Sequence, residues 1–155
     1  MARFSGTHKE RFSVAAPADI VLAHFADLKA IARNYGPIER ADILDDVTLS
    51  LLLQEKGMSG VRYQARYTVR YERDADSVRW RTIASENLWS SGEICVIGRD
   101  PNPGGSTQLD YTQHIETEIP VPRLLAKLAD GIVRREIVGG VQAYLQRMRD
   151  ACPRG

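Results

Sequence analysis

The chain contains little cysteine and no long hydrophobic run. Cys95 and Cys152 are its two cysteines in 155 residues, and neither has the spacing of a metal-binding pair. We therefore expect reduced thiols in a cytoplasmic protein, with no metal site. No apolar run approaches the ~20 residues that cross a bilayer, and the first residues, MARFSGTHKERFSV, form no apolar signal core. Secretion and insertion into a membrane are therefore not expected.

Neither sign of charge dominates, because 21 basic and 20 acidic side chains leave a net charge of +1. This balance gives no global field that would favour nucleic acid or an anionic membrane surface. The sequence also lacks the metalloprotease, P-loop, nucleophile-elbow and dinucleotide-binding motifs, so no cofactor is expected. Hydrophobic residues make up 43% and charged residues 26%, which is typical of one globular domain over residues 1–155.

The pattern along the chain predicts one strand, two short helices, six strands and a long helix. The first strand spans residues 4–14, and helical spacing runs from Pro17 to Gly36-Pro37 with a break at Asp27. Short turn-forming segments separate the six strands, which are expected at residues 38–46, 47–56, 60–73, 77–85, 87–98 and 106–118. Such turns favour antiparallel hairpins, and without βαβ alternation the expected class is α+β.

The strand 60–73 shows the clearest alternation of apolar and polar residues. Its apolar face consists of Val61, Tyr63, Ala65, Tyr67, Val69 and Tyr71. Trp80 has the same parity in the next strand, and Leu109 and Tyr111 have it in the last one. Phenols and an indole on an apolar face indicate either a ligand cavity or an aromatic-rich core, because each buried hydroxyl needs a partner.

Other polar residues favour structural roles. The opposite face of the sheet carries Arg62, Arg66, Arg70, Arg79 and Arg81. Phosphate binding is the alternative there, but nearby acidic residues favour a solvated, mixed-charge face. His24 is expected at the edge of a helix rather than in acid–base chemistry, and His114 is expected to bond with Glu116.

The final helical stretch, residues 118–150, does not keep its apolar residues on one side. Its first part places Leu124, Leu125, Leu128 and Ile132 together. Its second part places Ile137, Val141, Tyr144, Leu145 and Met148 roughly opposite to them. We therefore predict a bend at Asp130-Gly131, between a short helix that begins at Pro122 and a longer helix from about Ile132. The pair Gly139-Gly140 has no explanation at this point.

The stretch FSVAAPADIVLAHFADLKAIARNYGPI resembles the opening of helix-grip proteins of the START/Bet v 1 (SRPBCC) superfamily, which include polyketide cyclase-like and ligand-binding members. The likeness lies in the strand that ends at Ala16-Pro17, in Asp27 and in the exit Tyr35-Gly36-Pro37. The GGSTQLDY hairpin and the terminal Y-L-x-R-M helix also fit. The resemblance implies a curved antiparallel sheet of about seven strands around a long C-terminal helix, with two short helices after the first strand.

The resemblance further implies a cavity between the sheet and the helix, with the first helical piece covering its mouth. A small hydrophobic ligand, such as a lipid, polyketide or aromatic metabolite, would suit such a cavity. The expected ligand-binding residues are Tyr63, Tyr67, Trp80, Leu109, Tyr111, Leu128 and Ile132. A polyketide cyclase or dehydrase using the same cavity, and an interaction domain with a filled core, remain as alternatives. Catalytic residues stay unknown, and a homodimer is left open.

Overall fold

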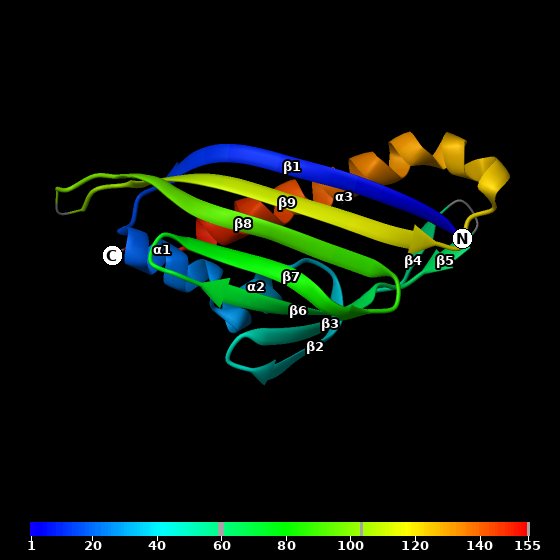
Figure 1. Cartoon of the computed structure of the whole chain (residues 1–155), viewed down its shortest axis with the longest axis horizontal. Helices are drawn as coiled ribbons and strands as arrows, with labels where there is room; N and C mark the ends of the chain where they lie inside the picture. Colours follow the sequence, from blue (N-terminus) through cyan, green and yellow to red (C-terminus); the bar gives the residue numbers. More distant parts are fainter. Residues whose placement is uncertain (59–60, 103, 155) are drawn as a thin grey trace.

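A computed structural model describes residues 1–58, 61–102 and 104–154, and it shows a curved sheet lying against a long C-terminal helix (Figure 1). The helices are α1 (Ala18–Phe25), α2 (Leu28–Asn34) and α3 (Arg123–Ala151). The strands are β1 (Ala2–Val14), β2 (Ile38–Asp45), β3 (Thr48–Leu53), β4 (Lys56–Met58), β5 (Val61–Tyr63), β6 (Arg66–Arg73), β7 (Ser77–Ser85), β8 (Leu88–Arg99) and β9 (Thr107–Ile119).

The main sheet has seven strands in the described part of the chain, in the order β1-β9-β8-β7-β6-β3-β2. All of its neighbouring strands pair antiparallel. With two short helices after β1 and a long helix at the end, this arrangement confirms the predicted helix-grip α+β fold. The single strand expected at 60–73 is divided, because β5 pairs with β4 in a separate two-stranded sheet while β6 joins the main sheet.

The predicted inner face of the sheet is confirmed in β6 and β7. Tyr67 and Trp80 are 2% and 7% exposed, whereas Arg66 and Arg79 on the alternate positions are exposed. Alternation with a period of two places one set of side chains against α3 and the other in water. Several of the outer arginines pair with acidic neighbours, for example Arg79 with Glu93, as expected for a mixed-charge face.

The two short helices meet at Asp27, whose carboxylate accepts a hydrogen bond from the backbone N–H of Lys29 at 3.0 Å and caps α2. The prediction for His24 was incomplete. Its side chain is only 7% exposed, and its Nε2 lies 2.8 Å from the carbonyl oxygen of Met148. His24 is therefore a core residue, and its hydrogen bond with Met148 links α1 to the end of α3. His114 bonds with Thr7 and Glu116, which confirms its structural role.

The helix α3 runs from Arg123 to Ala151 without the predicted break at Asp130-Gly131. Among the described glycines, only Gly36 and Gly104 have the positive φ that such a cap requires. The prediction of a bend is therefore wrong. In Figure 1 the first turns of α3 project past the β1 edge of the sheet, and its last turns lie across the sheet.

The two parts of α3 pack differently. The second part buries Val141, Tyr144, Leu145 and Met148 in the main core. The first part rests on a smaller cluster through Ala129 and Val133, which pack with Phe4 and Ile119. No helix in the described residues is long and apolar enough to cross a membrane.

Candidate ligand cavity

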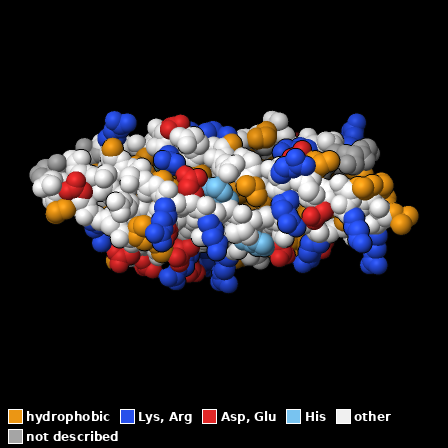
Figure 2. Space-filling view, turned by 90° about the horizontal axis from the view of Figure 1, so that it is seen from above, with side chains coloured by type: hydrophobic (Ala, Val, Ile, Leu, Met, Phe, Trp, Pro, Cys, Tyr) orange, Lys and Arg blue, Asp and Glu red, His pale blue; other side chains and the backbone are white. Residues whose placement is uncertain are grey.

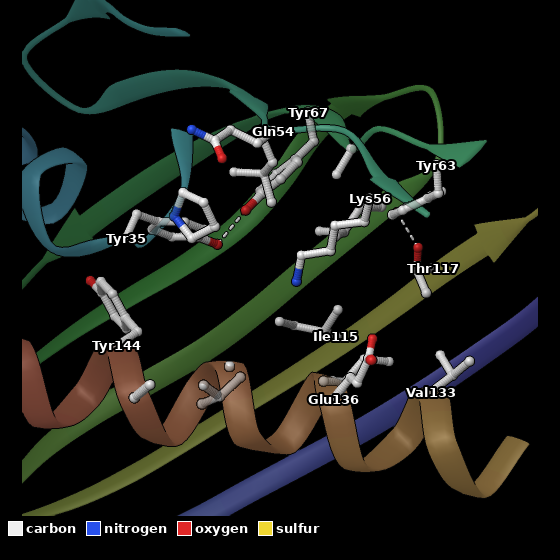
Figure 3. Close-up of a pocket in the computed structure, with 18 of the residues that line it drawn as sticks. Tyr35, Gln54, Lys56, Tyr63, Tyr67, Ile115, Thr117, Val133, Glu136 and Tyr144 are labelled. Carbon is white, nitrogen blue, oxygen red and sulfur yellow. Dashed lines mark hydrogen bonds between the residues drawn. The ribbon is translucent and has the colours of Figure 1, made fainter. Parts of the chain in front are cut away.

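A cavity of about 260 Å³ lies between the inner face of the sheet and α3 (Figure 3). Strands β6, β8 and β9 supply its floor, and the second half of α3 supplies the opposite wall. The segment after α2 and the β3–β5 region complete the rim. The lining residues are Tyr35, Pro37, Leu53, Gln54, Lys56, Tyr63, Ala65, Tyr67, Leu88, Gln113, Ile115, Thr117, Ile119, Val133, Glu136, Ile137, Gly140, Val141, Ala143, Tyr144 and Arg147.

Two hydroxyl pairs lie in the wall of this cavity. Tyr67 donates its hydroxyl proton to the hydroxyl oxygen of Tyr35, and Tyr63 bonds with the hydroxyl of Thr117 (Figure 3). Thr117 in turn donates to the backbone carbonyl oxygen of Asn87 at 3.0 Å. The wall is therefore apolar, with a few oriented hydroxyl groups that can each share a hydrogen bond with a ligand.

Burial keeps these phenols neutral. Loss of solvent raises the pKa of Tyr67 well above its ordinary value, and the neighbouring Tyr35 raises that pKa further. Burial also raises the pKa of Tyr35 and of Tyr63, although the hydrogen bonds to Tyr67 and Thr117 partly oppose this. At neutral pH the cavity phenols therefore act as hydrogen-bond donors and acceptors, and they cannot serve as phenolate bases.

Three charged side chains also line the cavity. Figure 3 shows the amine of Lys56 and the carboxylate of Glu136 directed into the cavity from the β4 strand and from α3. Among the described residues, neither of these two groups forms an ion pair. Arg147 is held at the rim, because its Nε donates to the carbonyl oxygen of Asn34 at 2.7 Å. The cavity thus combines an apolar interior with an amine and a carboxylate that come from exposed residues at its open side.

The predicted site residues divide into three groups. Tyr63 and Tyr67 line the cavity, as expected. Trp80 and Tyr111 instead border a second space of only about 10 Å³, where their ring centroids lie 5.5 Å apart. Leu109 is completely buried in the core and borders neither space. The aromatic face is therefore hollow at one end of the interior and packed at the other.

The expectation that Leu128 and Ile132 bind the ligand is wrong, because their side chains are 77% and 52% exposed and lie outside the cavity. Ala129 and Val133 take the inward positions on that part of α3. The apolar pattern of the helix does not distinguish the two faces, since both carry apolar residues. In the structure, this part of α3 presents its larger apolar side chains to solvent.

Several lining residues carry no signal in the sequence. Lys56 and Glu136 lie far apart along the chain, at the end of an expected strand and within the final helical stretch. In the sequence, Tyr35 is recognisable only as part of the Tyr-Gly-Pro exit of a helix. Gly140, which had no explanation, borders the cavity, and a side chain there would project into open space.

In the described part of the chain, no three His, Cys, Asp or Glu side chains gather as a metal site would require. The volume of the cavity argues against a fully packed core, since about 260 Å³ lies near the ~300–1,000 Å³ typical of small-molecule sites. The geometry therefore fits an organic ligand with a mainly apolar surface.

No family model matches the sequence, and no curated protein does. Solved structures do match. The Zhui aromatase/cyclase from Streptomyces sp. R1128 is 19% identical with a TM-score of 0.67, over 96% of this chain and 93% of that chain. A START superfamily protein from Mycobacterium smegmatis is 16% identical with a TM-score of 0.55, over 92% of this chain and 98% of that chain.

Norcoclaurine synthase from Thalictrum flavum, solved in complex with dopamine and hydroxybenzaldehyde, is 14% identical with a TM-score of 0.57. That match covers 96% of this chain and 86% of the synthase. At such low identities the three likenesses establish a common fold, and they do not extend to a ligand or a reaction.

Proposed function

Because this chain has the helix-grip fold of the START/Bet v 1 superfamily, we propose that it binds a small hydrophobic ligand between the sheet and α3. The cavity of about 260 Å³ is the observation that carries this proposal. Its wall is mainly apolar, and the hydroxyls of Tyr35, Tyr63 and Tyr67 offer a few oriented hydrogen bonds. A lipid fragment, a polyketide or an aromatic metabolite has matching chemistry. The cytoplasmic location stays a prediction.

A matched pair of glycines in α3 tests the cavity directly. Gly140 borders the cavity and Gly139 does not, and neither has a neighbouring atom within 4 Å of an added Cβ. Gly140→Leu should fill part of the cavity and abolish binding of a hydrophobic fluorescent probe such as anilinonaphthalene sulfonate. Gly139→Leu should leave the binding unchanged. Both variants gain helix propensity, so a loss confined to Gly140→Leu cannot come from unfolding.

The same pair can be purified from the native host and compared by native mass spectrometry. The wild type and Gly139→Leu should carry a small molecule that denaturation releases, and Gly140→Leu should be empty. Equal probe binding and equal cargo in both variants would contradict the proposal.

The second candidate is a polyketide cyclase or dehydrase that uses the same cavity. The amine of Lys56 and the carboxylate of Glu136 favour it, because an acid and a base directed toward one bound carbonyl substrate from the open side of the cavity can move protons on it. The phenols would then polarise the carbonyl oxygen as donors. An aromatase/cyclase among the structures of the same fold supports this candidate without identifying a substrate.

Replacing each cavity tyrosine by Phe separates binding from catalysis. In a binding protein, Tyr63→Phe or Tyr67→Phe should lower the affinity by no more than the ~0.5–1.5 kcal/mol of one neutral hydrogen bond. In an enzyme that relies on the hydroxyl, turnover should fall on the order of 10²-fold or more. Tyr71→Phe is the control, because Tyr71 is buried on the same face but borders only the small second space.

A further inference from the structure

The beginning of α3 exposes an unusual set of large apolar side chains, which we call the leucine ridge. It consists of Leu124, Leu125, Leu128 and Ile132, which are 93%, 44%, 77% and 52% exposed. Spacing of three and four residues places them on one face of the helix. Figure 2 shows hydrophobic side chains protruding beside Lys and Arg side chains at the end of the molecule where α3 begins. A contiguous exposed apolar surface of this kind marks an interaction site.

The leucine ridge cannot turn inward, because the opposite side of the helix is already packed. Ala129 and Val133 are 6% and 1% exposed and contact the cluster that contains Phe4 and Ile119. Rotating α3 to hide the ridge would expose those residues and disturb the cavity wall, to which Val133 also belongs. The ridge is therefore held outward by the fold, and it is preorganised for whatever covers it.

Positive charge accompanies the ridge. Between residues 123 and 135 the helix carries four exposed basic residues, Arg123, Lys127, Arg134 and Arg135, and a single acidic residue, Asp130. This segment has a net charge of +3, so the rest of a chain whose total is +1 has a net charge of −2. Although the net charge of the whole chain is near zero, the beginning of α3 is therefore basic and apolar, and the rest of the protein is slightly acidic.

We propose that the leucine ridge docks onto an anionic lipid bilayer. An amphipathic helix with leucines beside basic side chains lies in the interface of such a membrane, with its apolar side chains among the acyl chains and its cations at the headgroups. Charge complementarity favours lipid over a second copy of this chain, because a symmetric dimer through the ridge would oppose two segments of +3. The projection of this helix end past the sheet leaves it free to reach a flat surface (Figure 1).

Docking would place the ligand cavity close to the membrane. The cavity wall includes Val133, Glu136 and Ile137, which lie within about one turn of the end of the ridge on the same helix. A hydrophobic molecule dissolved in the bilayer would thus meet the cavity at the docked end of the protein. The docking depends on the ridge and the basic side chains beside it, and it does not rest on the proposed ligand binding.

Vesicle cosedimentation tests the proposal with the full-length chain. The wild type should bind vesicles of equal parts phosphatidylcholine and phosphatidylglycerol, and it should bind pure phosphatidylcholine weakly. The double variant Leu124→Ser with Leu128→Ser should lose at least about tenfold in partitioning, because two large side chains no longer enter the acyl region. The double variant Lys127→Gln with Arg135→Gln should lose about fivefold per charge, and rising salt should weaken wild-type binding.

The matched control is Ile43→Ser with Leu44→Ser, which removes two side chains of β2 that are 48% and 60% exposed but lie outside the ridge. This control should bind as the wild type does, and circular dichroism should show all variants folded. The proposal would be overturned if the wild-type protein does not bind anionic vesicles, or if the ridge and control variants bind them equally. A wild-type dimer that the Leu124→Ser with Leu128→Ser variant converts to a monomer, without vesicle binding, would overturn it and assign the ridge to a second copy.

Discussion

The two ends of the interior use the same face of one sheet and similar aromatic residues, yet one end is filled and the other is hollow. The filled end surrounds a space of about 10 Å³ and includes Phe25, Tyr71, Trp80 and Tyr111. The hollow end surrounds about 260 Å³ and includes Tyr63 and Tyr67. Phe25 of α1 closes the filled end, whereas α3 faces the hollow end with residues as small as Gly140 and Ala143. The covering helices, more than the sheet, decide where the cavity lies.

The largest expected effect is the loss of a ring at the filled end. Trp80→Ala should lower the free energy of unfolding by about 3–5 kcal/mol, because Trp80 packs against Tyr71 and Tyr111 and the change leaves a cavity. Ile115→Ala at the hollow end should have a smaller effect, because Ile115 already borders empty space. Urea denaturation measures both values. Equal losses would show that the two ends are packed alike.

A smaller effect is expected from adding one methyl group at the filled end. A Cβ at Gly92 would lie 2.4 Å from Cζ2 of Trp80 and 2.5 Å from the carbonyl oxygen of Thr112. Gly92→Ala should therefore destabilise the protein by about 1–3 kcal/mol, since the indole and the backbone must both shift. Gly139→Ala is the control, because its Cβ meets no neighbour within 4 Å. A thermal melt of Gly92→Ala that matches the wild type would mean that this end is loosely packed.

Alkaline pH should reveal the difference in burial between Tyr63 and the phenols of the filled end. Burial raises the pKa of Tyr71 and Tyr111 well above the ordinary value, and it raises that of the less buried Tyr63 by a smaller amount. The folded protein holds these protons more tightly than the unfolded chain does. The resulting stability is fully present below pH ~10 and is lost as the pH rises through the folded values.

Tyr71 and Tyr111 should each lower the free energy of unfolding by about 0.4 kcal/mol at pH 10, and by more at higher pH. Phenolate absorbance should show Tyr63 ionising first, as a comparison with Tyr63→Phe can establish. A single titration step at the ordinary tyrosine pKa would contradict the burial of the filled end.

A stabilising effect is expected in α3 beyond the hollow end. Since the helix is continuous and an added Cβ at Gly131 has no neighbour within 4 Å, Gly131→Ala should stabilise the protein by up to ~1 kcal/mol. The association and dissociation rates of the probe should not change. A loss of about 1 kcal/mol would instead support a left-handed bend at this position.

Most of the fold could be predicted from local pattern. The alternation that places Tyr67 and Val69 inward follows from the period of a strand. It is confirmed because their side chains are only 2% and 1% exposed. The break at Asp27 follows from its capping chemistry. The separate sheet of β4 and β5 was not predicted, because the alternation of Tyr63, Ala65 and Tyr67 continues across the point where β5 ends and β6 begins.

The site was less predictable, because a cavity forms where the elements that cover the sheet do not supply side chains large enough to fill the space. Trp80 and Tyr67 have the same parity, and the space beside Trp80 is filled by side chains from outside the sheet, including Phe25 of α1 and Tyr144 of α3. The apolar stripe through Leu128 suggested burial, but apolar residues are often exposed and the stripe alone does not show which face is covered. Lys56 and Glu136 meet only in the folded chain.

The paired hydroxyls of the cavity also determine how water behaves inside it. No buried nitrogen or oxygen of a side chain in the described residues lacks a hydrogen-bond partner, and the Tyr67–Tyr35 and Tyr63–Thr117 pairs satisfy one another. Water beside these paired hydroxyls therefore finds few free partners and keeps fewer hydrogen bonds than it has in bulk. Its release on ligand binding should give a favourable enthalpy near 25 °C, together with a negative change in heat capacity.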